Sequence, residues 1–453
     1  MADNMTEADE KGQSPTPQNG EPSYPPKDRG VAAWLFLIGA SIVEVTAWGF
    51  PYCYGVFREY FFNNEPFKGQ SIVSTGGVLA NGVLQITVPI VIYTCNIFPN
   101  QRKNAMWLGC LLCTVSPIAA AFTTSASALV VLLGPLYGIG AGLLFAPSMH
   151  FLDDWFEERK SFAYGIICGA GAAGGAGFPP AYTVALNKYG YKATLIGFGL
   201  ITFVVTALGL LLVKSRTPPE KAIKPTWQDV DFVRKPLFLV FLASTLVQGI
   251  AHYGPSAYLP SIGVEFGLSN TQGALLVSLL NLAQAIGQPL QGAIADSNAS
   301  FYVPLLISTI GGGGSSLLIW AFARKLYSLV IFSLVFGATA GGYAVLRPRF
   351  ARAVLGTDGK ALPEADSSEN LDETIARHRN KSMLIFGIFT AARGAAIIAS
   401  GFIDVTLVRN EYTSLAGYGL GPRWRDLIIF TGVVMTSASF GVFGRWIPHA
   451  LKW

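Results

Sequence analysis

The sequence has few charged residues for its length. Asp, Glu, Lys and Arg make up 13% of its 453 residues, about half of the roughly 25% that is typical of soluble domains. Histidine is scarcer still, with four residues. This composition excludes a soluble chain of several globular domains, which the length alone would suggest.

Cysteine is also sparse, and its placement excludes several kinds of chemistry. All five cysteines fall within apolar segments. Cys110 and Cys113 form a CxxC pair, but no second pair and no histidine stands near them, so packing explains them better than a metal or redox site. No nucleophile and base, and no metal-binding cluster, occur at a plausible spacing. We therefore expect neither an enzyme nor a bound cofactor or metal.

Long apolar runs, by contrast, recur through most of the chain. Windows of about 19 residues identify segments that can each cross a bilayer as a helix. They indicate an all-α integral membrane protein with twelve transmembrane helices in two six-helix bundles. The predicted spans are 31–57, 72–95, 105–123, 128–152, 161–186, 193–213, 236–261, 271–295, 301–323, 327–346, 382–405 and 427–447.

The formal charge of +5 becomes informative when it is sorted by side of the membrane. With the amino terminus inside, the cytosolic segments hold 22 Lys and Arg and the outer loops hold 9, while Arg393 lies within a span. Cytosolic loops are enriched in these residues, so both termini are expected in the cytosol. The positive charge is thus a topology signal, and no nucleic-acid partner is expected. The plasma membrane is the default location.

Composition also divides the chain into parts. Residues 1–29 are polar and are expected to form a disordered cytosolic tail. Residues 30–214 and 236–453 each hold six spans, and the basic segment 215–235 links them. Within the second half, residues 347–381 are expected to form a long cytosolic loop, in which SSENLDETIARHR could be a short surface helix.

The two halves resemble each other weakly. The second predicted span begins STGGVLANGVLQ and the eighth begins TQGALLVSLLNLAQ, and proline follows at Pro89 and Pro289. A parallel repeat of this kind is typical of transporters whose halves rock around a site at the membrane midplane.

One stretch, 134–180, joins two glycine-rich spans through a charged turn. Small residues three and four apart allow helix backbones to approach closely within a membrane. Between the spans, six charged residues occur within eight positions. Four of them are predicted to form a cytosolic gate network, with a substrate site as the alternative: Asp153, Asp154, Arg159 and Lys160.

Three motifs give the chain a family resemblance. Residues 28–34 read DRGVAAW, residues 49–57 read GFPYCYGVF, and residues 155–165 read WFEERKSFAYG. With these motifs the sequence resembles the major facilitator superfamily and, within it, the monocarboxylate-transporter-like family of fungal type. The resemblance implies a transporter that works by alternating access without a cofactor.

The departures from that family bear on mechanism. Animal lactate carriers of the family have a lysine directly after GFP, where this chain has Tyr52. They also have an Asp and an Arg in the eighth span, where this chain has Gln284 and Gln288. Proton–lactate symport therefore does not carry over with the resemblance.

Two ionisable residues stand near the middle of predicted spans. Arg393 and Glu44 would each cost about 2.5 to 3.5 kcal/mol to insert, so such groups usually face a cavity or a partner. We expect Arg393 to bind a substrate carboxylate, with a structural contact to Asp404 or to a helix-end carbonyl as the alternative. We expect Glu44 to accept the coupling proton, with an interhelical hydrogen bond as the alternative.

Polar side chains recur at four-residue spacing on several other spans, which places them on one face of each helix. The family resemblance places these helices around a central cavity. Together with Arg393, the candidate substrate-binding residues are Tyr52, Gln248, His252, Asn281, Gln284 and Gln288. For His252 and the glutamines, hydrogen bonds that bridge helices are the alternative.

These observations predict a secondary active transporter of a small organic anion, a monocarboxylate being the first candidate, with proton coupling. An efflux pump for a larger secondary metabolite is the first alternative, because glutamines in place of the charged pair suit a bulkier cargo. A non-transporting membrane sensor is the second alternative, supported by the loop 347–381 alone. The expected partners are a small carboxylate-bearing molecule and the lipid bilayer, and a monomer is expected.

Overall fold

A computed structural model describes residues 24–218, 227–297, 300–357, 368–409 and 417–448, and these residues form helices and turns without a β-strand. The part of the predicted disordered tail before residue 24, and residues 219–226 of the predicted linker, lie outside the described residues.

Fifteen α-helices build the described part of the chain. They are α1 (Val31–Asn63), α2 (Gly76–Ile97), α3 (Arg102–Ala121), α4 (Ala126–Val131), α5 (Tyr137–Trp155), α6 (Lys160–Leu212), α7 (Pro236–His252), α8 (Gly254–Glu265), α9 (Asn270–Asp296), α10 (Tyr302–Leu306), α11 (Gly312–Leu318), α12 (Leu326–Ala340), α13 (Arg347–Leu355), α14 (Ser368–Leu407) and α15 (Pro422–Ser437). Short 3₁₀ or π turns extend or join several of them, such as the π turn Leu132–Leu136 between α4 and α5.

The helices account for the predicted membrane spans. Within the described residues, eleven helical segments are long and apolar enough to cross a membrane. The longest, α6, has 53 residues, and Gly190 inside it has φ 73° and ψ 174°, which is outside the helical region. This glycine separates the predicted spans 161–186 and 193–213. The described residues thus hold twelve spans, and the chain is a multi-pass membrane protein.

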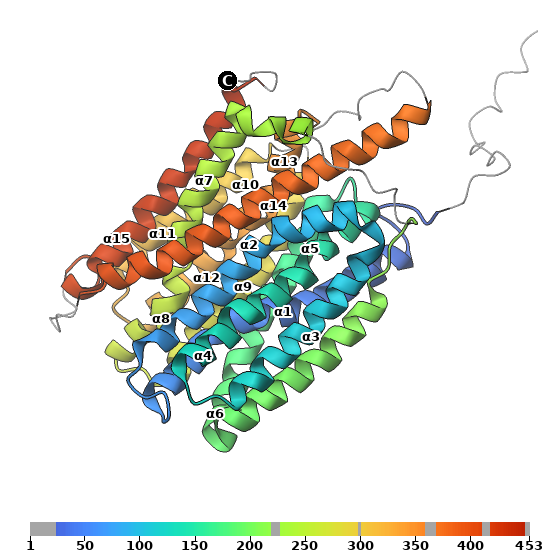
Figure 1. Cartoon of the computed structure of the whole chain (residues 1–453). Coiled ribbons are helices and arrows are strands. Elements are labelled where there is room, and N and C mark those ends of the chain that lie inside the picture. Colours follow the sequence, from blue (N-terminus) through green and yellow to red (C-terminus); the bar gives the residue numbers. More distant parts are fainter. Residues whose placement is uncertain (1–23, 219–226, 298–299, 358–367, 410–416, 449–453) are drawn as a thin grey trace, which may run out of the picture.

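The long helices run side by side along one direction (Figure 1). We call the end that holds Asp28 and the α5–α6 turn the proximal end, and the end that holds the α8–α9 turn the distal end. One hydrophobic cluster is built almost entirely from residues 33–213, whereas two others are built from residues 230–447. The chain thus has two helical halves, each with apolar packing of its own.

Glycine permits the closest contacts between these halves. A Cβ atom at Gly165 of α6 would lie 2.7 Å from the carbonyl oxygen of Gln288 on α9, and one at Gly169 would lie 2.6 Å from that of Ala285. On the other side, a Cβ at Gly394 of α14 would lie 2.6 Å from the carbonyl oxygen of Gly82 on α2. The close approach that the small-residue pattern predicts is therefore present, and a larger residue at these positions would push the halves apart.

Two helices occupy most of the segment 347–381 that the sequence suggested as a cytosolic loop. Helix α13 fills Arg347–Leu355, and α14 begins at Ser368 and continues without interruption into the membrane span. Charge made this segment resemble a loop, but its helices have an apolar side that packs: Phe350 and Val354 of α13 are fully buried. The suggested short surface helix is the first part of α14.

Candidate functional site

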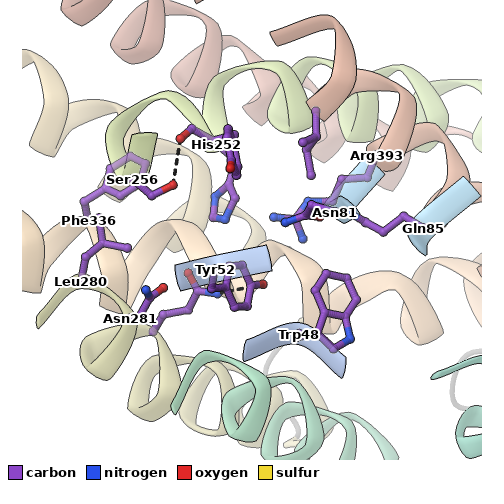
Figure 2. A pocket seen from close by; sticks show the side chains of 13 residues that line it. Trp48, Tyr52, Asn81, Gln85, His252, Ser256, Leu280, Asn281, Phe336 and Arg393 are labelled. Atoms are coloured by element: carbon purple, nitrogen blue, oxygen red, sulfur yellow. Dashed lines mark hydrogen bonds between the residues drawn. The ribbon is translucent and has the colours of Figure 1, made fainter. Parts of the chain in front are cut away.

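A small cavity lies where the two halves meet near the middle of the helices, and we call it the central cavity (Figure 2). Its volume of about 20 Å³ leaves room for roughly one water molecule. It is lined by Trp48, Tyr52, Asn81, Gln85, His252, Tyr253, Ser256, Leu280, Asn281, Gln284, Phe336, Arg393 and Ile397.

Both halves contribute walls. The first half supplies residues from α1 and α2, and the second half supplies residues from α7, α8, α9, α12 and α14. Four-residue spacing along each helix turns these side chains to one face. Because the walls belong to different halves, any relative motion of the halves changes the shape of the cavity.

Arg393 brings a positive charge to the central cavity. Its side chain extends from α14 beside Asn81 and Gln85 (Figure 2), and only 5% of its surface is exposed. Its Nε atom has no hydrogen-bond partner, and no acidic side chain in the described part of the chain pairs with it. The predicted alternative, an ion pair with Asp404, is not formed: the hydrogen bond that Asp404 receives comes from Ser400, at 3.4 Å.

A second buried arginine, which sequence reasoning assigned to the cytosolic loop, lies close to the first. Arg347 is 2% exposed, and its Nη1 donates to the hydroxyl of Thr390 at 2.8 Å. Its Nε donates to the carbonyl oxygen of Ala344 at 3.0 Å. Thr390 precedes Arg393 by three residues on α14, so the two guanidinium groups lie along one face of that helix. The centre of the molecule therefore carries concentrated positive charge.

Four other predicted residues line the central cavity. Tyr52, His252, Asn281 and Gln284 come from α1, α7 and α9. The amide of Gln284 donates to the hydroxyl of Tyr52 at 3.5 Å, and that of Asn281 donates to the carbonyl oxygen of Gly175 at 3.1 Å. The Nδ1 atom of His252 has no hydrogen-bond partner. The site thus offers several hydrogen-bonding groups around one cation.

The remaining two predicted glutamines bridge helices instead. Gln248 donates to the carbonyl oxygen of Ala340 at 3.3 Å, and Gln288 donates to that of Gly341 at 3.2 Å. Gln248 lies one helical turn from His252, and Gln288 lies one helical turn from Gln284. Both form their hydrogen bonds at the end of α12. Neither contributes to the wall of the central cavity.

Glu44 lies outside the central cavity. The side chain is fully buried on α1, and neither carboxylate oxygen has a hydrogen-bond partner within bonding geometry among the described residues. Trp48, one turn further along α1, lines the cavity and packs against Tyr52 with ring centroids 5.9 Å apart. The indole thus stands at the cavity wall on the same helical face as the acid.

A much larger cavity adjoins the central one and extends to the distal ends of α1, α8 and α14; we call it the distal cavity. Its volume is about 980 Å³, and it shares Tyr52, Tyr253 and Ser256 with the central cavity. Aliphatic and aromatic side chains such as Leu79 and Phe402 form much of its wall. A volume of this size accommodates a drug-sized molecule.

The proximal end, in contrast, is held together by ion pairs. Arg379 of α14 donates to Asp154 of α5 at 2.7 Å, which connects the two halves, and Lys160 pairs with Asp153 within the first half. The side chain of Arg159 is exposed, and its backbone N–H takes part in the capping contact described next. Three of the four predicted gate side chains are therefore in this network.

Sequence reasoning missed two further acids at this end. Asp28 accepts hydrogen bonds from the backbone N–H groups of Glu157, Glu158 and Arg159 at 2.9 to 3.2 Å, just before α6 begins. Asp296 of α9 accepts from the N–H of Phe162 at 2.7 Å and pairs with Arg349 at 3.0 Å. An acid at a helix amino terminus satisfies free N–H groups and complements the helix dipole.

Comparison with known proteins places this architecture in a family. The family model described as Major Facilitator Superfamily matches residues 70–357, more than half of the chain. An MFS transporter, asaE, of Aspergillus flavus is 24% identical over 341 residues, covering 75% of this chain and 76% of that protein. Monocarboxylate transporter 12 of Xenopus laevis is 24% identical over 355 residues, covering 72% and 76%. The aspyridones efflux protein apdF of Emericella nidulans is 22% identical over 340 residues, covering 73% and 67%. The chain therefore belongs to the Major Facilitator Superfamily and is a membrane transporter rather than an enzyme.

Proposed function

We propose that this transporter carries an organic anion with a carboxylate group, most simply a monocarboxylate, and that Arg393 binds the carboxylate. The observation that carries the proposal is a buried guanidinium at the wall of the central cavity, with which no acid among the described residues pairs. A charge in this position is unfavourable unless an opposite charge visits it. The planar fork of arginine matches a carboxylate through two parallel hydrogen bonds.

The surrounding groups fit a small polar head. Tyr52, His252, Asn281 and Gln284 offer donors and acceptors within the same cavity. Arg347, which donates a hydrogen bond to the hydroxyl of Thr390, adds a second positive charge near this site. With a volume near that of one water molecule, the central cavity would have to widen around the carboxylate, whereas the remainder of the cargo would extend into the distal cavity.

We infer alternating access as the transport mechanism. The distal cavity would receive cargo while the Asp154–Arg379 pair keeps the proximal end closed. The distribution of Lys and Arg supports a cytosolic position for both termini, so the distal cavity would face away from the cytosol. The plasma membrane remains the proposed location, and a monomer the proposed state.

Proton coupling is proposed at Glu44. Moving one unpaired charge against a membrane potential of 100 mV costs about 2.3 kcal/mol, and a proton that accompanies a monoanion removes this penalty. Glu44 is a buried acid one helical turn from a cavity residue, Trp48.

Efflux of a larger secondary metabolite is the second candidate. The distal cavity of about 980 Å³ exceeds what a short monocarboxylate requires. Glutamine at positions 284 and 288, where animal lactate carriers have an ion pair, also suits a bulkier cargo. The relatives include both a protein named for monocarboxylate transport and one named for aspyridone efflux. Measuring the direction of flux and the size of accepted cargo in vesicles separates the two candidates.

The Arg393→Ala variant tests the proposal directly. A hydrogen bond to a charged group contributes about 1.5 to 3 kcal/mol, so the apparent affinity for carboxylates should fall by roughly 10- to 150-fold. Uptake of labelled carboxylates and of their neutral amides into proteoliposomes, with Arg393→Lys in parallel, gives the measurement. Arg324→Ala serves as the matched control, because Arg324 is exposed and contacts the carbonyl oxygen of Gly417. Undiminished carboxylate uptake by Arg393→Ala would remove Arg393 from the proposed site.

A further inference from the structure

A buried acid on the wall of the distal cavity has no place in the function proposed so far. Asp404 of α14 is 2% exposed and lines this cavity. Its Oδ2 accepts one long hydrogen bond from Ser400 at 3.4 Å, and its Oδ1 accepts none from the described residues. No basic side chain in the described part of the chain forms an ion pair with it. A buried carboxyl group with unused acceptor capacity is a binding feature that needs an explanation.

Polar groups from other helices gather around the same part of the cavity. Tyr253, between α7 and α8, and Tyr258 of α8 both line the distal cavity with Asp404. Arg58 faces the cavity from α1, where its Nε donates to Ser74 at 3.2 Å. Gly254 lies against the acid, since a Cβ there would be 3.1 Å from Oδ2. A side chain at Gly254 would therefore crowd the carboxyl group.

We propose that Asp404 is a second cargo-binding subsite, which accepts a hydrogen bond from an ammonium, hydroxyl or amide group at the far end of an elongated acid. The proposal rests on the proposed function, because Arg393 would hold the carboxylate at the near end. Both residues are on α14, eleven positions apart, which corresponds to about 16 Å along the helix. The apolar wall of the distal cavity lies between them.

This geometry specifies the chemistry of the cargo. One end is a carboxylate, the body is apolar and about as long as an extended chain of twelve carbons, and the other end is a hydrogen-bond donor. A short monocarboxylate would occupy only the Arg393 end. A donor at the far end would satisfy the free acceptor atom of Asp404, and a ligand that leaves such a group unpaired forfeits binding energy.

Three probes of equal length test the subsite: dodecanoate, 12-aminododecanoate and 12-hydroxydodecanoate. Each is measured as an inhibitor of the uptake of a labelled short acid, propionate, by the full chain in proteoliposomes. For each variant we take the ratio of the inhibitory concentration of dodecanoate to that of 12-aminododecanoate. We expect this ratio to be about 10-fold higher in the unmodified protein than in Asp404→Asn. Comparing this ratio between variants cancels the different partitioning of the probes into lipid.

Two variants keep the test interpretable. Gly254→Ala retains the acid but crowds it, and should reduce the same ratio even if Asp404→Asn folds poorly. Glu65→Gln alters an exposed acid just after α1 that lines neither cavity and should leave the ratio unchanged.

Failure of this proposal differs from failure of the proposed function. A ratio that is equal in the unmodified protein, Asp404→Asn and Gly254→Ala would overturn the subsite while leaving Arg393 untouched. Stronger inhibition by dodecanedioate than by 12-aminododecanoate would also overturn it, because the far contact would then be with Arg58. If Arg393→Ala leaves inhibition by all the probes unchanged, the carboxylate site itself is wrong.

Discussion

Arg393 and Glu44 show two different surroundings for an ionisable residue within a membrane helix. The guanidinium of Arg393 reaches a cavity that both halves line, whereas Glu44 is enclosed within the first half. Sequence spacing alone treats them alike, because each stands near the middle of a predicted span. Their exposure to a cavity, and therefore to cargo, depends on which neighbouring helices they face.

Substitution of Glu44 by glutamine tests its proposed role in proton coupling. Glutamine keeps the size and hydrogen-bonding capacity of the side chain but cannot exchange a proton, so we expect the pH dependence of transport to flatten. The measurement is the initial uptake rate from pH 5 to 8, with and without an imposed pH gradient. A pH profile identical to that of the unmodified protein would make Glu44 a structural residue.

Sequence predicted some of the polar residues that line the central cavity, but none of the apolar ones. Arg393, Tyr52 and His252 stand out because polar groups are rare in membrane spans. Phe336 and Ile397 line the same cavity, but an apolar residue that faces a cavity looks the same in sequence as one that faces lipid. Arg347 escaped notice for a different reason, because it belongs to the charged run Arg-Pro-Arg, which is typical of a cytosolic loop.

At the scale of helices, the start of α6 depends on a residue far away in sequence. Asp28 accepts hydrogen bonds from the backbone N–H groups of Glu157, Glu158 and Arg159, which have no partner within the helix. The sequence placed Asp28 before the first membrane span and gave no sign of this contact, because 129 or more positions separate donor and acceptor. The motif resemblance identified both segments but did not show that they touch.

Loss of this cap should destabilise the proximal end. Replacement of an N-terminal capping acid by alanine typically costs about 0.5 to 2 kcal/mol, so Asp28→Ala should lower the melting temperature of the purified protein. Hydrogen exchange at residues 157–159 should also become faster, since their N–H groups lose an acceptor. Lys27→Ala is the matched control, because the Lys27–Glu157 pair is exposed and contributes little. Unchanged exchange in Asp28→Ala would show that the cap is dispensable.

The spans were the most predictable elements. Each has enough apolar residues to cross a bilayer, and Gly190 separates the two that the structure joins as α6. The breaks inside spans were not predicted: α7 ends at His252 and α8 begins at Gly254, within one predicted span. The Gly-Pro pair at 254–255 accounts for this break, because proline cannot donate the hydrogen bond that would continue the helix.

At the scale of the whole molecule, sequence predicted the fold class but not the conformation. Twelve spans and a twofold repeat indicate two rocking halves, whichever end is open. In this structure Asp154 and Arg379 connect the halves at the proximal end, a contact that the proposed alternating access would break. The sequence does not show whether this contact is formed, because the two residues are 225 positions apart.

Breaking the Asp154–Arg379 pair should shift the molecule toward a proximal opening. Loss of one partner removes the attraction that connects the halves at a partly buried site, and the loss of one partner costs about 3 to 5 kcal/mol for fully buried pairs. Because the side chain of Arg379 is 20% exposed, we expect a smaller effect. The measurement is the reactivity of a cysteine introduced at Ser161, a buried residue at the start of α6 that packs against Gly292 of α9, toward a thiol reagent that cannot cross the membrane.

The exchanged pair provides the control. Asp154→Arg combined with Arg379→Asp should restore low reactivity, whereas Asp154→Asn alone should raise it. If the single and the double variants react equally, the pair does not hold the proximal end closed.

Helix α14 carries Arg379 near one end, Arg393 in its middle and Asp404 near the other end, over an uninterrupted run from Ser368 to Leu407. An unbroken helix moves nearly as a rod, so a shift at one of these positions displaces the other two. Events at the ends and the middle are then thermodynamically linked, and linkage is reciprocal. If cargo binding at Arg393 changes the equilibrium for breaking the Asp154–Arg379 ion pair, then breaking that ion pair changes the affinity for cargo by the same factor. Mutations remote from the cargo would therefore still alter its affinity.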